Sequence, residues 1–435
     1  MTRTGPASLS AATPGAWYRG VDRRARRALF AAFLGWMLDG MDVMLFAFAL
    51  TAIREEFGLS AAAAGGLASL TLITSAVGGT LSGYAADRYG RVRLLIVSIL
   101  IYSLCTGATA LARTLFQLAL CRALVGFGLG AEWSAGSVLV AESWPAAHRG
   151  KAIGFVQSGW AIGYILAALL SAVVLPAWGW RALFLLGIAP ALLTLWVRRS
   201  VDEPEIWLRR SGGTGAANRA RGAHVDLPRA ERPDVMAIVR PPLLRFTLAA
   251  SLLCAVVLFA YWGLFTWIPT FLASPVEKGG AGLGMVRSSL YIVPMQIGAF
   301  LGYFLFGVAA DRIGRRPAFL VFVLGAAGLV PLYGLFARSP LSLLMLGPCI
   351  GFFGHGYFSL FGAMLAELFP SAVRATAQGL CYNSGRAISA LAPFAIGAAA
   401  DRWGYGSALA LTASFFLAAA GLIFLLPETR GRELA

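Results

Sequence analysis

Long apolar runs, each interrupted by few charged residues, recur along almost the whole chain. A helix of about 20 apolar residues is long enough to cross a hydrocarbon core of about 30 Å. The pattern contains twelve runs of this kind, which predicts an all-α polytopic membrane protein. We expect the spans at residues 28–50, 62–86, 93–112, 115–141, 149–175, 181–198, 244–272, 286–310, 317–337, 340–366, 373–400 and 406–427.

The apolar pattern stops between the sixth and the seventh span. Residues 199–243 are rich in Arg, Gly, Pro and Ala and show almost no apolar periodicity, which is typical of a solvated linker. The sequence therefore predicts two bundles of six helices, at 28–198 and 244–427. A segment at 1–27 precedes the first bundle, and a tail at 428–435 follows the second.

Two sequence motifs of the first predicted bundle recur at matching positions in the second. GYAADRYGRVR, which begins at Gly83, matches GVAADRIGRRP, which begins at Gly307. AESWPAAHRG, from Ala141, matches AELFPSAVRA, from Ala366. Both pairs are separated by about 225 residues, and duplicated six-span halves with a binding site between them are how many secondary transporters are built.

Charge is scarce and unevenly placed. Charged residues make up 13% of the chain, against about 25% in soluble domains. The net charge of +16 does not indicate nucleic-acid binding, because Lys and Arg gather before span one and after spans two, four and eight. The intervening loops carry isolated charges such as Arg54, Arg113 and Arg338. This alternation is the positive-inside bias, so we expect both termini in the cytoplasm and the protein in the cell inner membrane.

The five cysteines all lie in apolar runs, without paired spacing. We therefore expect no disulfide framework, no metal site and no cofactor.

Two carboxylates interrupt the first span, LGWMLDGMDVMLFAFAL from Leu34 to Leu50. A carboxylate at mid-bilayer costs roughly 2.5 kcal/mol or more, and Asp39 and Asp42 share one helix face because they are three residues apart. Either could permanently neutralise a buried arginine. Alternatively, a carboxyl in a cavity beside a second one can take up and release a proton near neutral pH. We favour proton coupling, with Asp39, the deeper of the two, as the first candidate.

Span four contains Arg122 and, ten residues later, Glu132. A buried arginine is costly unless it is paired. Arg122 could pair structurally with an aspartate of span one, or act as the proton-linked switch that releases that aspartate. We include Arg122 and Glu132 in the predicted proton-coupling set.

Arg386 is the main substrate-binding candidate. It lies well inside span eleven, and its counterpart in the first half is Ala161, so the internal repeat does not require a charge there. A guanidinium presents a planar fork of donors that suits a carboxylate. Alternatively, Arg386 is the structural partner of an acid such as Glu132. Other polar candidates for the site are Gln157, Tyr164, Gln296, His355, Tyr382 and Asn383. His355 is a lone histidine in a glycine-rich helix, where a hydrogen-bonded packing role is the commoner one.

Acidic and basic residues meet at the cytoplasmic ends of the predicted spans. Such charges can hold neighbouring helices together, or they can be solvated helix ends. The acids recur in both halves, which favours a gate. The predicted gate residues are Asp87, Arg88, Arg91, Glu142, Arg149, Asp311, Arg312, Arg315, Glu367 and Arg374.

These motifs resemble those of the major facilitator superfamily, over essentially all twelve spans. The loop motif GxxxDRxGR and the segment RALVGFGLG from Arg122 carry the likeness. More narrowly, WYR, GAEWSAG and AESWP resemble the sialate and monocarboxylate (lactate-type) proton symporters, and DGxD in span one also occurs in aromatic-acid proton symporters. The resemblance implies two pseudo-symmetric six-helix bundles, alternating access, and a cytoplasmic gate that holds the outward-open state.

The function predicted from the sequence is proton-coupled symport of a small organic anion: a monocarboxylate, a sialate-like acid or an aromatic acid. Efflux or uniport by the same fold is an alternative. An enzyme is not expected, because HExxH, GxSxG and a second membrane histidine are absent. A transporter-like sensor would usually add a signalling domain. The expected partners are the solute, protons and the lipid bilayer, and we expect a monomer.

Overall fold

A computed structural model of the chain describes residues 21–144, 149–203, 235–337, 339–370 and 373–430. All regular elements within these residues are helices, which confirms the predicted fold class. The first half contains α2 (Arg23–Phe57), α3 (Ala61–Tyr89), α4 (Arg91–Thr109), α5 (Leu115–Ser143), α6 (Arg149–Leu186) and α7 (Pro190–Ser200). The second half contains η2 (Val235–Val239), α9 (Leu243–Phe265), α10 (Ile268–Ala273), η3 (Val276–Lys278), α11 (Gly284–Ile313), α12 (Arg315–Pro331), η4 (Leu332–Phe336), α13 (Pro340–Gly356), α14 (Phe358–Leu368), α15 (Arg374–Ser389), α16 (Ala392–Trp403), α17 (Tyr405–Leu422) and η5 (Ile423–Leu425).

Each of the twelve predicted spans is present as helix. Ten described segments are long and apolar enough to cross a membrane. One of them, Ala152–Ser200, is 49 residues long and turns back at Gly179, so it holds spans five and six. Helices α15 and α16 together form span eleven.

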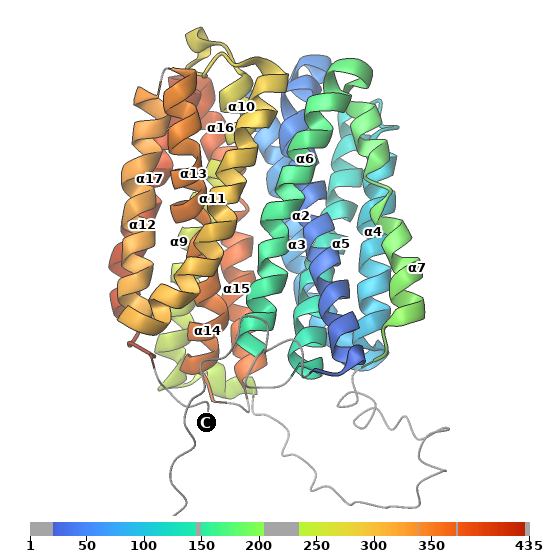
Figure 1. Ribbon diagram of the computed structural model, residues 1–435, viewed down its shortest axis with the longest axis vertical. Coiled ribbons are helices and arrows are strands. Elements are labelled where there is room, and N and C mark those ends of the chain that lie inside the picture. Colours follow the sequence, from blue (N-terminus) through green and yellow to red (C-terminus); the bar gives the residue numbers. More distant parts are fainter. Residues whose placement is uncertain (1–20, 145–148, 204–234, 338, 371–372, 431–435) are drawn as a thin grey trace, which may run out of the picture.

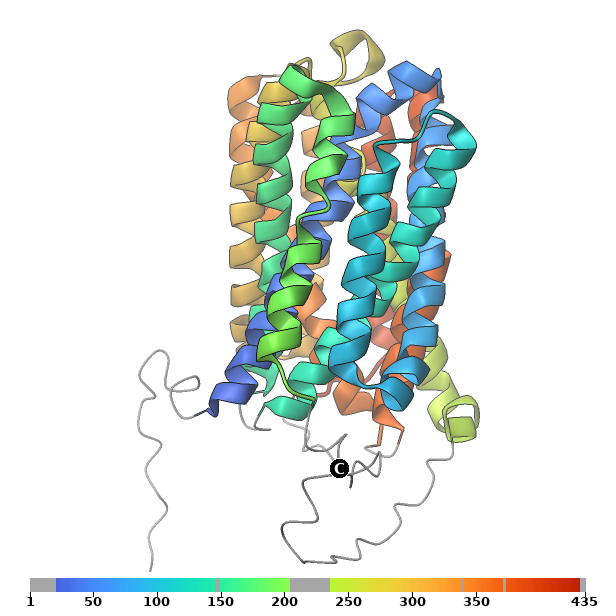
Figure 2. The same ribbon diagram turned by 90° about the vertical axis from the view of Figure 1, so that its right-hand side faces the viewer.

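The two halves lie side by side, and they meet where α6 packs against α11 and where α3 packs against α15 and α16 (Figure 1). Helix α2 begins, α7 ends and α9 begins at the same end of the molecule, which we call the linker end (Figures 1 and 2). The opposite end, where α2 ends and α3 begins, is the far end. Residues 204–234 of the predicted linker lie outside the described residues, and the predicted domain boundaries remain a prediction.

Four glycines with positive φ form the corners between consecutive helices. They are Gly90 (φ 107°), Gly179 (72°), Gly314 (106°) and Gly404 (79°). With the extended ψ that all four share, this backbone conformation is essentially restricted to glycine. The corners between α3 and α4 and between α11 and α12 lie at the linker end, whereas the corner within α6 and the one between α16 and α17 lie at the far end (Figure 1). The corner therefore recurs once in every three helices, as expected for a repeat nested within each half.

A glutamate after the last helix of each half caps the helix that follows a linker-end corner. Glu203 accepts hydrogen bonds from the backbone amides of Arg91 (2.8 Å) and Val92 (3.0 Å) at the start of α4. Glu428 accepts one from the amide of Arg315 (2.9 Å) at the start of α12. Burial by itself would raise the pKa of Glu428, but the amides that donate to it lower that pKa below its ordinary value. These caps join elements of the same half.

We expect Gly90→Ala to destabilise the protein by about 1–3 kcal/mol, the usual cost of such a backbone conformation in a residue with a side chain. A Cβ atom at position 90 would also lie 2.3 Å from Glu203 Oε1. Gly307→Ala is the matched control, because a Cβ there meets no atom within 4 Å. The measurement is the melting temperature of the detergent-purified variants, and equal melting temperatures for the two would contradict the assignment.

Candidate functional site

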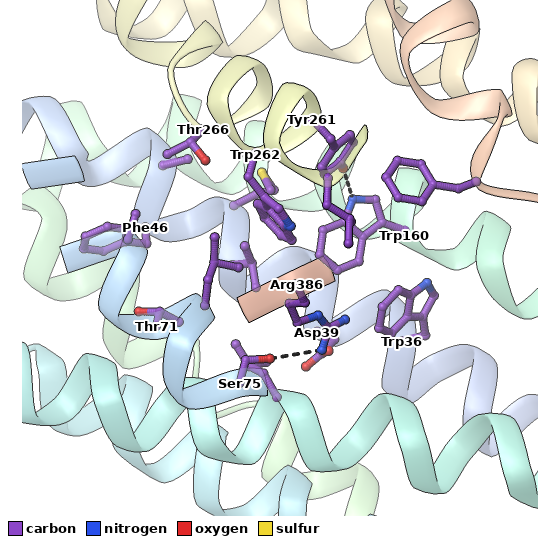
Figure 3. Close-up of a pocket in the computed structure, with 18 of the residues that line it drawn as sticks. Trp36, Asp39, Phe46, Thr71, Ser75, Trp160, Tyr261, Trp262, Thr266 and Arg386 are labelled. Atoms are coloured by element: carbon purple, nitrogen blue, oxygen red, sulfur yellow. Dashed lines mark hydrogen bonds between the residues drawn. The ribbon is translucent and has the colours of Figure 1, made fainter. Parts of the chain in front are cut away.

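One cavity lies between the two halves, lined by α2, α3, α5 and α6 of the first half and by α9, α11, α14 and α15 of the second (Figure 3). Five of the residues singled out in the sequence line it. They are Asp39, Arg122, Gln157, Tyr382 and Arg386. The cavity therefore brings together the first candidate for proton coupling and the first candidate for anion binding.

Asp39 reaches this cavity from the middle of α2. Its side chain is 3% exposed, and its Oδ1 has no hydrogen-bond partner among the described residues. Glu132 of α5 and Arg386 of α15 are close enough to act on it electrostatically. Glu132 is also buried, and it lies against Gly35, where a Cβ would come 2.3 Å from its Oε1. Asp42 acts on Asp39 as well, so two like charges and one opposite charge influence this carboxylate.

Arg386 is held by contacts to both halves. Its Nη1 donates a hydrogen bond to Ser75 Oγ of α3 at 3.2 Å, and its guanidinium carbon lies 5.3 Å from the ring centroid of Tyr382, one turn earlier on α15. Figure 3 shows the guanidinium beside Asp39 and Ser75. The buried cation therefore belongs to the second half, whereas the hydroxyl and the carboxylate beside it belong to the first.

Asp42 does not line the cavity, although it is on the same helix as Asp39. It is fully buried inside the first half, where the nearest opposite charge is that of Arg122. Arg122 Nε donates to Thr71 Oγ1 at 3.3 Å, and its guanidinium carbon lies 4.4 Å from the ring centroid of Phe46. Both interpretations of Arg122, structural pairing and proton-linked switching, therefore concern Asp42 more directly than Asp39.

Aromatic rings form one side of the cavity, and they are not among the residues predicted from the sequence. The ring centroids of Trp36 and Trp160 are 4.9 Å apart, and Trp160 meets Trp262 edge to face at 6.0 Å. Trp160 Nε1 donates to the hydroxyl of Tyr261 at 2.8 Å, across the interface between the halves (Figure 3). Trp36 could have been found from the sequence, because it precedes Asp39 by three positions on one helix face. Nothing in the sequence distinguished Trp160 or Trp262 from ordinary core residues.

His355 lies behind Tyr261 and not on the cavity lining. Its Nδ1 is 3.1 Å from the carbonyl oxygen of Gly351, and its Nε2 is 3.4 Å from the Tyr261 hydroxyl. A carbonyl can only accept, so Nδ1 carries the proton and Nε2 accepts from Tyr261. This chain of hydrogen bonds supports the packing interpretation of His355.

Three other candidates also lie off the lining. The hydroxyl of Tyr164 donates to the carbonyl of Phe265 at 3.2 Å and so joins the two halves. Gln296 is fully buried, and neither polar atom of its side chain has a hydrogen-bond partner among the described residues. Asn383 lies where α15 meets α3, with its Oδ1 3.1 Å from the position of a Cβ at Gly79.

The predicted gate is only partly described. Arg315 and Glu367 form an ion pair at 3.1 Å, and Thr429 Oγ1 donates to Glu367 at 2.5 Å. Arg91 is buried, with its Nη1 2.8 Å from the Ala86 carbonyl. Arg312 is exposed. The side chains of Asp87, Arg88, Glu142, Arg149, Asp311 and Arg374 lie outside the described residues. The described contacts of Arg315, Glu367 and Arg91 join elements of the same half.

A charged cavity between two duplicated six-helix bundles defines a membrane transporter. Comparison with protein families gives the same class: the chain belongs to the Major Facilitator Superfamily, whose model matches residues 32–295 and 279–434. It is therefore a multi-pass membrane transporter and not an enzyme.

Similar proteins cover nearly the whole chain. The cis,cis-muconate transport protein of Acinetobacter baylyi is 34% identical over 371 residues, which cover 85% of this chain and 86% of that protein. The sialic acid transporter NanX of Escherichia coli is 29% identical over 406 residues, covering 93% and 94%. Among solved structures, a D-xylose–proton symporter has a TM-score of 0.72 at 21% identity and covers 94% of this chain and 100% of its own. At 21% identity, the similarity to the D-xylose–proton symporter shows a shared fold alone.

Proposed function

We propose that the protein is a proton-coupled symporter of a small organic anion. The observation that carries this proposal is the placement of Asp39 and Arg386, from opposite halves, side by side in one buried cavity. The names of the relatives support it, because muconate and sialic acid both carry carboxylates.

Coupling follows from competition for one cation. In the substrate-free site Arg386 attracts Asp39. A substrate carboxylate that takes over the guanidinium leaves Asp39 in the cavity with two like charges acting on it, those of Glu132 and Asp42. Two carboxylates at such a site cannot both remain ionised without a large cost, so Asp39 accepts a proton as the anion binds. Anion and proton then cross together, because each makes the binding of the other more favourable.

The lining favours a flat, unsaturated acid among the three kinds of anion that the sequence left open. Trp36, Trp160 and Trp262 offer large apolar surfaces, onto which planar groups pack well. A polyhydroxylated sugar acid would instead need many hydrogen-bond partners, since each buried hydroxyl without one costs free energy. The muconate relative fits this choice, because muconate is a planar diene.

We further propose that the protein lies in the cell inner membrane with the linker end in the cytoplasm. The bias of Lys and Arg toward segments at that end supports this orientation. A monomer remains the expected state.

Arg386→Lys tests the anion site. The variant keeps the charge but loses the planar fork, so we expect normal folding and a ten- to hundredfold loss of affinity, about 1.5–3 kcal/mol. The measurement is thermal stabilisation of purified protein by cis,cis-muconate, benzoate, lactate and N-acetylneuraminate. Arg287→Lys, at an exposed position of α11, is the matched control.

If Arg386 were only a counter-ion, Arg386→Ala would lower the melting temperature of the protein without ligand, and adding Asp39→Asn to that variant would restore it. An undiminished ligand shift in Arg386→Lys would remove Arg386 from the anion site.

Asp39→Asn tests proton coupling. Asparagine cannot carry a proton, so accumulation driven by a pH gradient should be lost, whereas counterflow of preloaded substrate should stay measurable. Asp42→Asn is the matched control, and its effect should be milder, because Asp42 lies off the cavity. Uphill transport at the wild-type level in Asp39→Asn would exclude Asp39 as the proton carrier.

Ser211→Cys, in a variant without the five native cysteines, tests the orientation. A membrane-impermeant maleimide should leave this position unlabelled in intact cells and label it after permeabilisation. Labelling in intact cells would reverse the proposed topology.

A further inference from the structure

The corner motif of the internal repeat occurs a third time in the chain. AADRYG, from Ala85, and AADRIG, from Ala309, are followed by AADRWG, from Ala399. All three copies end a helix at a glycine with positive φ, which is Gly404 in the third copy. The first two copies lie at the linker end, whereas the third lies at the far end, between α16 and α17 (Figure 1).

The third copy differs from the others in the residue after its glycine. That residue is Arg91 in the first copy and Arg315 in the second, but it is Tyr405 in the third. The cation at this corner comes instead from the other half of the protein. Arg54, in the last turn of α2, donates a hydrogen bond from Nη1 to the Tyr405 hydroxyl, and its Nη2 lies 4.0 Å from Asp401 Oδ1.

Asp401, the aspartate of the third copy, caps the first turn of α3. Its Oδ1 accepts from the amide of Ala61 at 3.0 Å, and its Oδ2 accepts from the amide of Ala62 at 2.9 Å. The next amide, that of Ala63, donates to Ser60 Oγ at 3.1 Å. A carboxylate is favourable at this position because the amides at a helix start lack partners within the helix and carry partial positive charge.

This cap differs from those of Glu203 and Glu428 in one respect that matters for transport. Those two join elements of the same half, so they can persist when the halves move relative to each other. Asp401 belongs to the second half and α3 to the first. The contact therefore cannot survive an opening of the far end that separates α3 from α16.

The helices beneath the cap are in backbone contact. A Cβ at Gly65 of α3 would lie 2.2 Å from the carbonyl oxygen of Pro393, and a Cβ at Gly397 of α16 would lie 2.5 Å from that of Ala61. The amide of Phe394 donates to Ser69 Oγ at 3.3 Å. The far end is thus closed over several turns of α3 and α16, and the cap lies at its outermost turn.

We propose that Asp401 and Arg54 form a far-end latch, which holds the far side of the transport path closed and whose release sets how often the cavity opens there. The described contacts of Arg54 and Asp401 are with Leu59, Tyr405 and the start of α3, none of which lines the cavity, so the latch acts on any solute that the cavity carries. It goes beyond the proposed anion symport, and it holds whether or not that function is correct.

The test measures how often the far end opens, in the absence of substrate. Ala68, a buried cavity-lining residue of α3, is replaced by cysteine in a variant without the five native cysteines. The rate at which an impermeant maleimide labels this position from outside the cell is proportional to the far-end-open population. Asp401→Asn should raise the rate about tenfold, and Asp401→Ala, which removes the hydrogen-bonding group as well, should raise it further.

Glu277→Gln is the matched control, because it removes an exposed carboxylate at the same end and should leave the rate unchanged. Arg54→Gln keeps the cap but removes its cation, so a smaller increase is expected. If the Asp401 variants do not accumulate in the membrane, the labelling rate of Arg54→Gln alone decides whether the latch restrains opening of the far end. A wild-type labelling rate in Arg54→Gln together with a wild-type rate, or no accumulation, in Asp401→Asn would overturn the latch.

Discussion

Two buried charges of opposite sign, Asp39 in the first half and Arg386 in the second, meet at the centre of the molecule, and much of the structure follows from them. Neither charge can face hydrocarbon without a large cost in free energy. Each therefore depends on the other half for a partner, which places the cavity at the interface and fixes which faces of α2 and α15 look inward. An ion pair inside one half would have stabilised that half alone. Opposite charges on the two halves instead make the relative position of the halves depend on what else binds there.

The glycines of α5 explain how the polar groups of α3 come so close to this pair. A Cβ at Gly130 would lie 1.8 Å from the carbonyl oxygen of Ser75, and a Cβ at Gly126 would lie 2.1 Å from that of Thr71. The intervening Gly128 faces the other way, toward the backbone of α4. Helix α5 is therefore wedged between α3 and α4, and this close packing holds Ser75 against Arg386. The small residues allow the approach, as they do at many helix contacts in membranes.

The spans and the charged residues inside them could be predicted from the sequence. The cavity residues of types that are common in membrane helices could not. The twelve spans were found from the length of their apolar runs, and Asp39 and Arg386 were found because a charge in a membrane helix requires an explanation. Trp160 and Trp262 were not found, because aromatic residues are ordinary in such helices, and only the meeting of α6 with α9 makes them a cavity wall. Asp42 illustrates a different limit. Residues three apart on a helix still differ by about 60° in direction, and at the edge of a cavity that angle separates a lining residue from a buried one.

The internal repeat gives a physical reason to look for function where the halves differ. Positions that serve the fold recur. The corner glycines do so in each three-helix unit and the capping glutamates Glu203 and Glu428 in each half, because matching helices have the same backbone amides and turns to accommodate. Positions that act once per molecule need not recur. Arg386 occupies the position of Ala161, a fully buried residue of α6, so the fold at that point needs only a small side chain. Likewise, Tyr405 follows the glycine of the third copy of the corner motif, where the first two copies have an arginine, and Asp401 of this copy contacts the opposite half. Where two positions have equivalent backbones but different side chains, the backbone cannot explain the difference between the side chains. The solute or the movement of the halves is then its cause.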